Sequence, residues 1–247
     1  MQSPLEQFVI KPIYPISLGG YDVSFTQSSL WMVIAVIVAG LLMTLSVSKK
    51  ALVPGRWQNV AEMFYEVVFG LTDEYLHDNA KKYFPFVFTL FMVVLMGNLL
   101  GLIPYSFTYT SHIAVTFALA LTVFVLTTGV AIWIHGWHFF SYFVPEGAPK
   151  LLIPLLVLIE VVSYLSRLIS LPVRLFANMM AGHVMMEVFA SFMVMMAGAG
   201  TIGVIGAFFP QAINVILIGF ELLVSALQAY VFALLTCLYL HDAVHLH

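Results

Sequence analysis

Ionisable side chains gather in one apolar stretch of this sequence, from Glu160 to Glu187, which reads EVVSYLSRLISLPVRLFANMMAGHVMME. A charge at the centre of a membrane helix costs about 2.5 to 3.5 kcal/mol on insertion scales, so such residues usually face a partner or a water-filled path. At about 100° per residue, a set of polar side chains points within roughly 40° of the direction of Arg174. The set, with Arg174 itself, is Glu160, Ser163, Arg167, Ser170, Arg174 and Asn178. The stretch therefore predicts a membrane helix with one polar stripe.

The opposite side of the same helix carries titratable groups, since His183 and Glu187 come out roughly opposite the stripe by the same arithmetic. Serine and asparagine in membrane helices often serve only helix packing through hydrogen bonds, and that reading stays open for the serines and for Asn178. Arg174 differs, because a guanidinium keeps its proton at any physiological pH and imposes a permanent positive potential. We therefore expect one face to hold a fixed charge and the other a proton relay.

The composition is that of an integral membrane protein. Hydrophobic residues make up 62% of the 247 residues and charged residues 9%, against about 45 to 50% and about 25% in soluble domains. This length suits one bundle of five or six spans, so we predict a single membrane domain over residues 1–247. Nine Lys and Arg residues do not form the clustered basic face that nucleic-acid binding needs. The single cysteine, Cys237, excludes an intramolecular disulfide and a cysteine-based metal cluster. We expect no metal site and no cofactor.

The elements that position these residues follow from hydropathy and charge. An uncharged run of about 20 residues predicts a first span over 28–48. Lys49, Lys50 and Arg56 follow it, so this end is expected on the cytoplasmic or matrix side and the amino terminus on the periplasmic or intermembrane side. Polar residues at helical spacing then predict an amphipathic interfacial helix over 57–78, with a solvated linker helix as the alternative.

Two further spans, over 84–104 and 112–135, are joined by a short uncharged link and predict a membrane hairpin. Asn98 lies deep in the first of them and is interpreted as a hydrogen bonder in helix packing. Residues 136–150 are rich in Pro and Gly and predict a loop.

The last third of the chain is predicted to form two long helices. Residues 151–196 would span roughly 69 Å at about 1.5 Å per residue, more than twice a bilayer, so this helix must tilt strongly, kink or lie partly along the membrane. The glycine-rich stretch 197–210 suits a turn or close packing. A final helix over 211–240 carries a second polar stripe within roughly 40° of Glu221, made of Asn214, Glu221, Ser225 and Gln228. The tail HDAVHLH is expected in water.

These elements describe an all-α integral membrane protein with one N-terminal span, an interfacial helix, a hairpin and two long tilted helices. The strings LPVRLFANMMAGH and FELLVSALQAYVFALLTCLYLHDA, with NLLGLIPYSFT upstream and PLEQF near the start, resemble subunit a of F-type ATP synthases. The similarity runs along essentially the whole chain, and its order of histidine and acid is similar to that of the alphaproteobacterial and mitochondrial branch.

The resemblance implies a proton-conducting stator subunit that is no enzyme on its own and couples proton flow to rotation and ATP synthesis. It implies a multi-pass location in a bacterial plasma membrane or the mitochondrial inner membrane. The implied partners are the c-subunit ring, b-type subunits of the peripheral stalk, the rest of the F1Fo ATP synthase, membrane lipid and protons, with no nucleic acid.

The resemblance also assigns roles. It implies that Arg174 is the family's essential arginine, which faces the c ring and separates two half-channels, and that Asn178 and Gln228 occupy polar positions near it. Glu160 matches an acidic position of the channel on the F1 side.

On the other side, the resemblance implies that His183 and Glu221 form the pair that leads protons in. Arg167 and Glu187 lie outside the family pattern. From its place on the stripe we expect Arg167 to be an electrostatic or structural partner of Glu160.

Two alternatives from other classes remain at this point. A b-type cytochrome subunit would hold haem between histidines that face one another within the spans. His112 and His135 lie at the two ends of a predicted span, which leaves His183 alone in the interior of a span. A stand-alone secondary transporter often shows two similar halves, and no internal repeat is evident.

Overall fold

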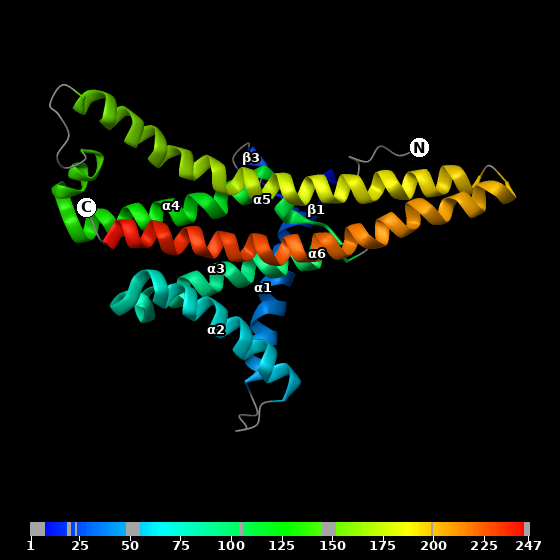
Figure 1. Ribbon diagram of the computed structural model, residues 1–247, viewed down its shortest axis with the longest axis horizontal. Helices are drawn as coiled ribbons and strands as arrows, with labels where there is room; N and C mark the ends of the chain where they lie inside the picture. The colour runs from blue at the N-terminus through cyan, green and yellow to red at the C-terminus, as the bar shows by residue number, and fades with distance from the viewer. Residues whose placement is uncertain are drawn as a thin grey trace. The chain divides into compact units, whose positions relative to one another are not determined.

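The computed structural model describes residues 8–18, 21–22, 24–47, 55–103, 106–144, 152–198 and 200–244. The described chain is mostly helical (Figure 1). Its helices are α1 (Gln27–Ser46), α2 (Arg56–Leu76), α3 (Ala80–Gly101), α4 (Ile113–His135), α5 (Ile153–Ala197) and α6 (Thr201–Val244), with 3₁₀ turns η2 (His77–Asn79), η3 (Tyr109–Ser111) and η4 (Gly136–Phe143).

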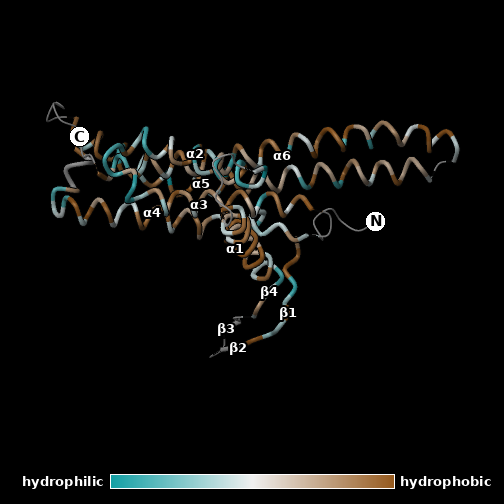
Figure 2. Tube along the Cα trace, turned by 90° about the horizontal axis from the view of Figure 1, so that it is seen from below, coloured by the Kyte–Doolittle hydropathy of each residue, from teal (hydrophilic) through white to brown (hydrophobic). Residues whose placement is uncertain are grey.

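Within the described residues, five helical segments are long and apolar enough to cross a membrane. They are Gln27–Ser46, Arg56–Gly101, Ile113–Phe139, Ile153–Ala197 and Thr201–Val244. Hydrophobic residues predominate along them, as α1 shows in Figure 2. The predicted class, an all-α integral membrane protein, is confirmed.

Short strands precede α1, which the sequence analysis did not predict. Strand β1 (Pro12–Tyr14) pairs antiparallel with β4 (Phe25–Thr26), and β2 (Ser17–Leu18) pairs with β3 (Tyr21–Asp22). Strands of two or three residues are too short for an alternating pattern to stand out, because alternation is recognised over about four to eight residues.

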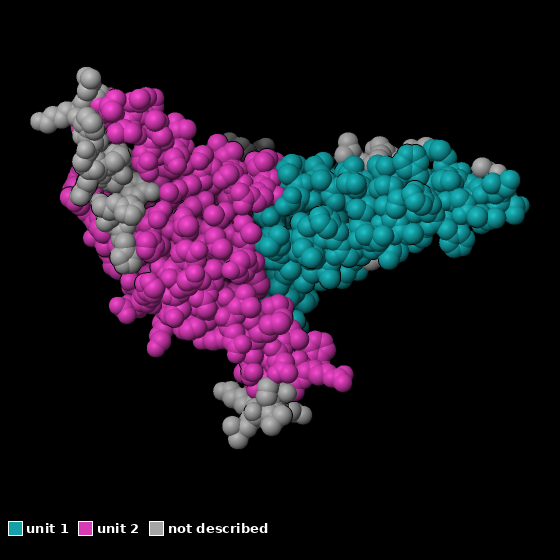
Figure 3. Space-filling model, in the orientation of Figure 1, with its two compact units in different colours: residues 1–45, 92–112, 175–229 teal, residues 46–91, 113–174, 230–247 magenta. Residues whose placement is uncertain are grey.

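The described chain divides into two compact units (Figure 3). Unit 1 comprises residues 1–45, 92–112 and 175–229, and unit 2 comprises 46–91, 113–174 and 230–247. Helices α3, α5 and α6 each contribute one part to each unit. The single membrane domain stays a prediction.

Helix α2 (Arg56–Leu76) covers most of the segment 57–78 that was predicted to form an amphipathic helix. Its apolar face supplies buried Ala61, Val68, Leu71 and Leu76. In unit 2, α2 packs on the start of α3 through aromatic rings, with the Tyr65 and Phe84 centroids 4.9 Å apart. Its place at the membrane interface stays a prediction, as does the orientation of the chain, because Lys49 and Lys50 lie outside the described residues.

Helix α5 is assigned without interruption from Ile153 to Ala197 and includes Pro172. The predicted boundaries of α6 were wrong at both ends. The helix begins at Thr201 and extends through Pro210, so most of the glycine-rich stretch 197–210 is helical.

Only Gly200 adopts a positive φ among the described residues of that stretch, at 91°. Glycine inside an apolar segment does not by itself end a helix. Gly206 instead allows close packing, because a Cβ at this position would collide with the end of the Met196 side chain. The stretch therefore serves both a turn and close packing.

Two smaller corrections concern segments that were predicted to be irregular. Residues 136–143 of the predicted loop form the 3₁₀ helix η4, while 145–150 lie outside the described residues. At the end of the chain α6 continues to Val244, so His241 and Asp242 are helical, whereas residues 245–247 lie outside the described residues. The aqueous environment of the tail stays a prediction.

Candidate functional site

The polar stripe of α5 is largely exposed. Ser163, Ser170, Arg174 and Asn178 are exposed, while Glu160 and Arg167 are half-buried. On either side of Arg174 the helix α5 buries Leu171 and Leu175, while Arg174 itself points out to the surface. In the part of the chain that the structure describes, no carboxylate forms an ion pair with Arg174. The guanidinium therefore presents an uncompensated positive charge on an apolar helix.

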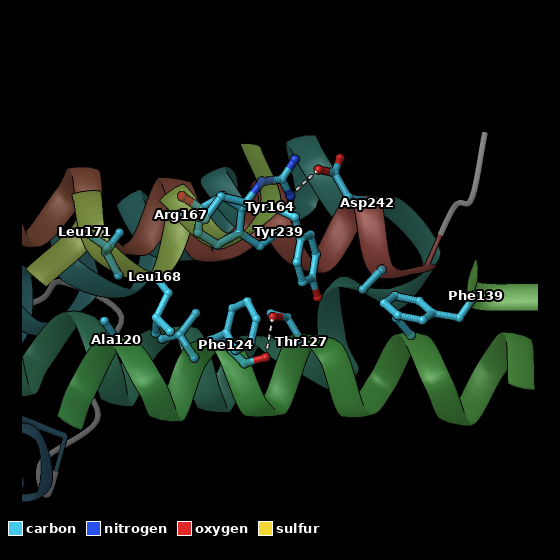
Figure 4. Close-up of a pocket in the computed structure, with 13 residues that line it drawn as sticks. Ala120, Phe124, Thr127, Phe139, Tyr164, Arg167, Leu168, Leu171, Tyr239 and Asp242 are labelled. Carbon is cyan, nitrogen blue, oxygen red and sulfur yellow. Dashed lines mark hydrogen bonds and ion pairs between the residues drawn. The ribbon is translucent and has the colours of Figure 1, made fainter. Parts of the chain in front are cut away.

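Arg167, two turns earlier on the stripe, has a carboxylate partner. Its Nη1 donates to Oδ2 of Asp242 on α6 at 2.8 Å, and the two side chains are 21% and 20% exposed. The rings of Tyr239 and Tyr164 lie 5.0 and 5.7 Å from the guanidinium carbon. Figure 4 shows the ion pair beside the two tyrosines at the edge of an apolar pocket in unit 2.

The sequence analysis did not predict this ion pair, because Asp242 was assigned to the tail. The acid that binds Arg167 here is Asp242, whereas the predicted partnership of Arg167 with Glu160 stays a prediction.

In unit 1 the C-terminal part of α5 lies beside the first part of α6 (Figure 1). Asn178 Nδ2 donates to Gln228 Oε1 at 3.1 Å. The polar stripe predicted on α6 is the side of that helix that the protein buries, since Glu221, Ser225 and Gln228 are buried. The two stripes thus meet at Asn178 and Gln228.

Glu221 is buried against the backbone of α5, with 4% of its surface exposed. A Cβ added at Gly182 would collide with its carboxylate, so glycine there makes room for the acid. Among the described residues, Oε1 of Glu221 has no hydrogen-bond partner. The carboxylate therefore lies beside the residue that precedes His183.

His183 makes a hydrogen bond to the connector between α3 and α4. Its Nε2 lies 2.9 Å from Oγ1 of Thr108. The Phe8 ring and the imidazole lie nearly perpendicular to one another, with centroids 6.3 Å apart. No hydrogen bond joins His183 to Glu221 in the described residues, so the predicted pair is brought near in space without direct bonding.

Other buried polar atoms of unit 1 lack a partner within the described chain. They are Asn98 Oδ1, Thr110 Oγ1, Asn214 Oδ1 and Ser225 Oγ, in addition to Glu221 Oε1. A buried polar group without a hydrogen bond costs about 1 to 3 kcal/mol, and ordered water commonly satisfies such groups. This set of atoms therefore suits a hydrated polar path through unit 1.

Asn98 also confirms its predicted role in helix packing. Its Nδ2 donates to the backbone carbonyl of Ser225 at 3.4 Å and so joins α3 to α6.

Comparison with known protein families identifies the family of this chain. The family described as ATP synthase A chain matches residues 29–241 of the chain. The chain belongs to this family. This membership favours an ATP synthase subunit over the two alternatives, a haem subunit and a stand-alone transporter.

Individual members of the ATP synthase A chain family are similar along nearly the whole chain. A protein of Granulibacter bethesdensis named ATP synthase subunit a is 58% identical over 231 residues, which cover 93% of this chain and 92% of the relative. One of Chelativorans sp. with the same name is 54% identical over 242 residues, covering 98% and 97%. One of Rhodospirillum rubrum is 48% identical over 247 residues, covering all of both chains.

Sequence reasoning missed several groups that the structure places near the candidate site. Thr108 and Tyr109 were treated as part of a short link, and Asp242 as tail. The string GNLLG held a usable signal, because Gly97 and Gly101 lie about one helical turn apart. Without side chains at these two positions, Thr108 and Tyr109 of the link can pack closely against α3. The functional roles of Arg174, Asn178, Gln228, Glu160, His183 and Glu221 stay predictions.

Proposed function

We propose that this chain is the proton-translocating subunit a of a rotary ATP synthase, and that it offers two offset half-channels to carboxylates of a c-subunit ring. The observation that carries the proposal is Arg174: a permanent charge, exposed on an apolar helix, with no carboxylate bound to it in the described chain. A guanidinium in a membrane is stable only with a counter-charge or water. A passing ring carboxylate would supply the counter-charge.

The mechanism follows from that electrostatic requirement. A ring carboxylate coming from lipid is protonated and neutral. Near Arg174 its charged form is favoured, because an opposite charge at about 4 to 6 Å lowers a carboxyl pKa by 1 to 3 units. The carboxylic acid therefore releases its proton into one half-channel.

A second proton must then reload the carboxylate before it returns to lipid. We assign the inlet path to His183 and Glu221, since histidine titrates near neutral pH and the buried polar atoms around Glu221 suit water. Glu160 would serve the outlet on the F1 side.

Arg174 keeps the two half-channels apart in this mechanism. A guanidinium keeps its proton in proteins, so Arg174 cannot relay a proton itself, and its positive charge repels a proton that would pass straight through. The Asn178 to Gln228 hydrogen bond holds the neighbouring turns of α5 and α6 together.

The proposal makes the chain part of a larger assembly in an energy-coupling membrane. The exposed apolar surface of α5 suits contact with the c ring and lipid, and b-type stalk subunits would hold the chain against rotation.

The test replaces Arg174 in the assembled complex. We expect Arg174→Ala to abolish ATP-driven proton pumping in reconstituted vesicles without loss of assembly. Arg174→Lys should also fail or nearly fail, because an ammonium lacks the planar fork and shifts its pKa when buried. Vesicles with the alanine variant that still acidify on addition of ATP would overturn the proposal.

A further inference from the structure

The connector between α3 and α4 folds back onto α3. The hydroxyls of Ser106 and Thr108 both donate to the Gly101 carbonyl at 3.1 Å. The Tyr109 hydroxyl donates to the Val93 carbonyl at 3.0 Å. Several buried side chains of unit 1 therefore owe their positions to backbone carbonyls of one helix.

Two glycines make this close approach possible. A Cβ at Gly97 would collide with the Tyr109 phenol, and a Cβ at Gly101 would collide with the Thr108 side chain. Tyr109 is 2% exposed, and burial raises the pKa of its hydroxyl, so it stays a protonated donor. The connector is thus a docked element that presents Thr108 to His183.

The two hydrogen bonds of Thr108 determine which way its hydroxyl points. A hydroxyl has one proton to donate and lone pairs with which to accept. The Gly101 carbonyl can only accept, so the Thr108 proton lies on that bond. The 2.9 Å contact with Nε2 is then satisfied only if His183 donates Nε2–H to the threonine oxygen.

We propose that Thr108, anchored on the Gly101 carbonyl, fixes His183 as the Nε2–H tautomer, so that protons are exchanged at Nδ1. Thr108 is then a positioning residue of the inlet path. This inference rests on the proposed role of His183 in proton transfer.

The proton balance is simple. A proton from water adds to the Nδ1 lone pair and gives an imidazolium with hydrogen on both ring nitrogens. The Nε2–H stays bonded to Thr108, and the proton on Nδ1 leaves to the next acceptor, which restores the neutral ring. Thr108 transfers no proton at any stage, because its own is held by the carbonyl.

Three elements carry titratable groups close to His183 in the chain or in space. Glu221 comes from α6, with its carboxylate against Gly182. Glu187 lies one turn further along α5, and Tyr109 follows Thr108 in the connector. The Thr108 hydroxyl, which accepts from Nε2–H, also influences the protonation of His183. It favours the imidazolium form, because a charged donor makes the stronger hydrogen bond.

The two tautomers predict opposite pH responses when the hydroxyl is removed. In Thr108→Val the imidazolium loses its acceptor, so the midpoint of the pH profile of proton pumping should move to lower pH. If instead Thr108 donated to Nε2, the hydroxyl would favour the neutral ring and its loss would move the midpoint to higher pH. The sign of the shift therefore reports the tautomer.

The experiment measures ATP-driven proton pumping by the complete complex in vesicles matched for complex content, over the pH range in which imidazole titrates. We expect Thr108→Val to lower the maximal rate about tenfold, as loss of a partner that orients a histidine does elsewhere. Thr108→Ser keeps the hydroxyl and should restore rate and midpoint. If the complex with Thr108→Val fails to assemble, Thr108→Ala is measured in its place.

Ser106→Ala is the matched control, because it removes the other hydroxyl on the Gly101 carbonyl without touching His183. It should leave the pH midpoint unchanged. In a His183→Ala background, Thr108→Val should add no further loss, and an added loss would indicate a merely structural role and overturn the inference.

The remaining outcomes separate the two proposals. Normal pumping by His183→Ala would overturn the assigned role of His183 itself. The other outcome is that His183→Ala impairs pumping while Thr108→Val leaves the pH profile unaltered or moves its midpoint to higher pH. That result would overturn the tautomer inference alone.

Discussion

Replacing Arg167 by glutamine removes the guanidinium from the ion pair with Asp242 and from the two tyrosine rings beside it. A hydrogen bond to a charged group contributes about 1.5 to 3 kcal/mol, and each cation–π contact at an exposed site about 0.5 to 1 kcal/mol. Both partners are about one-fifth exposed, at 21% and 20%, so screening reduces these values. We expect Arg167→Gln to destabilise the fold by about 2 kcal/mol.

The partner variant separates the ion pair from the ring contacts. Asp242→Asn leaves the guanidinium on Tyr164 and Tyr239 and should cost about 1 kcal/mol. Because the pair acts as one unit, adding Asp242→Asn to Arg167→Gln should cost little more than Arg167→Gln alone. Ser170→Ala, on the exposed part of the same stripe, is the control and should change stability by less than about 0.5 kcal/mol.

The assay is thermal unfolding of the complex in lipid, with a probe on this subunit. At about 2 to 4 °C per kcal/mol for chains of 150 to 250 residues, Arg167→Gln should lower Tm by about 4 to 8 °C. Coupled pumping at moderate temperature should fall without vanishing, since Arg174 remains. Strictly additive losses of Tm in the double variant, or complete loss of pumping in a fully assembled Arg167→Gln complex, would refute the reasoning.

Two further predictions concern the proposed inlet. Gly182→Ala places a methyl group where the Glu221 carboxylate lies, and overpacking of this kind costs about 1 to 3 kcal/mol. The carboxylate should therefore be displaced and the rate of proton pumping should fall severely. An unchanged pumping rate would contradict the contact between Gly182 and Glu221. His183→Ala and Glu221→Gln should each slow proton flux severely, and the double variant should be little worse than the poorer single, since residues that act as a unit give non-additive losses. The exchanged variant, His183→Glu with Glu221→His, should recover part of the rate; additive losses without recovery would show that the two do not share a path.

Much of the fold was predictable because hydrophobic length and helical period are local properties. An apolar run of sufficient length must form a helix in lipid, where every backbone group needs an internal partner. The ends were less predictable: the start of α6 was placed ten residues late, at 211 instead of Thr201, because glycine and proline signal a break in water but are tolerated in membrane helices.

The sequence by itself determined which side chains share a face. At about 100° per residue, spacing alone put Glu221, Ser225 and Gln228 together, and α6 buries all three. It also singled out Arg174, since the cost of a membrane charge makes its presence informative without coordinates.

Only the tertiary structure decided which atoms bond. Arg167 meets Asp242 and His183 meets Thr108, partners that are each 75 positions away in the chain. Such pairings depend on how helices and connectors dock, and a hydrogen bond requires about 3 Å and a favourable angle. Periodicity gives the face on which a group lies, whereas the bonds that set a guanidinium's partner or an imidazole's tautomer arise from packing between distant segments.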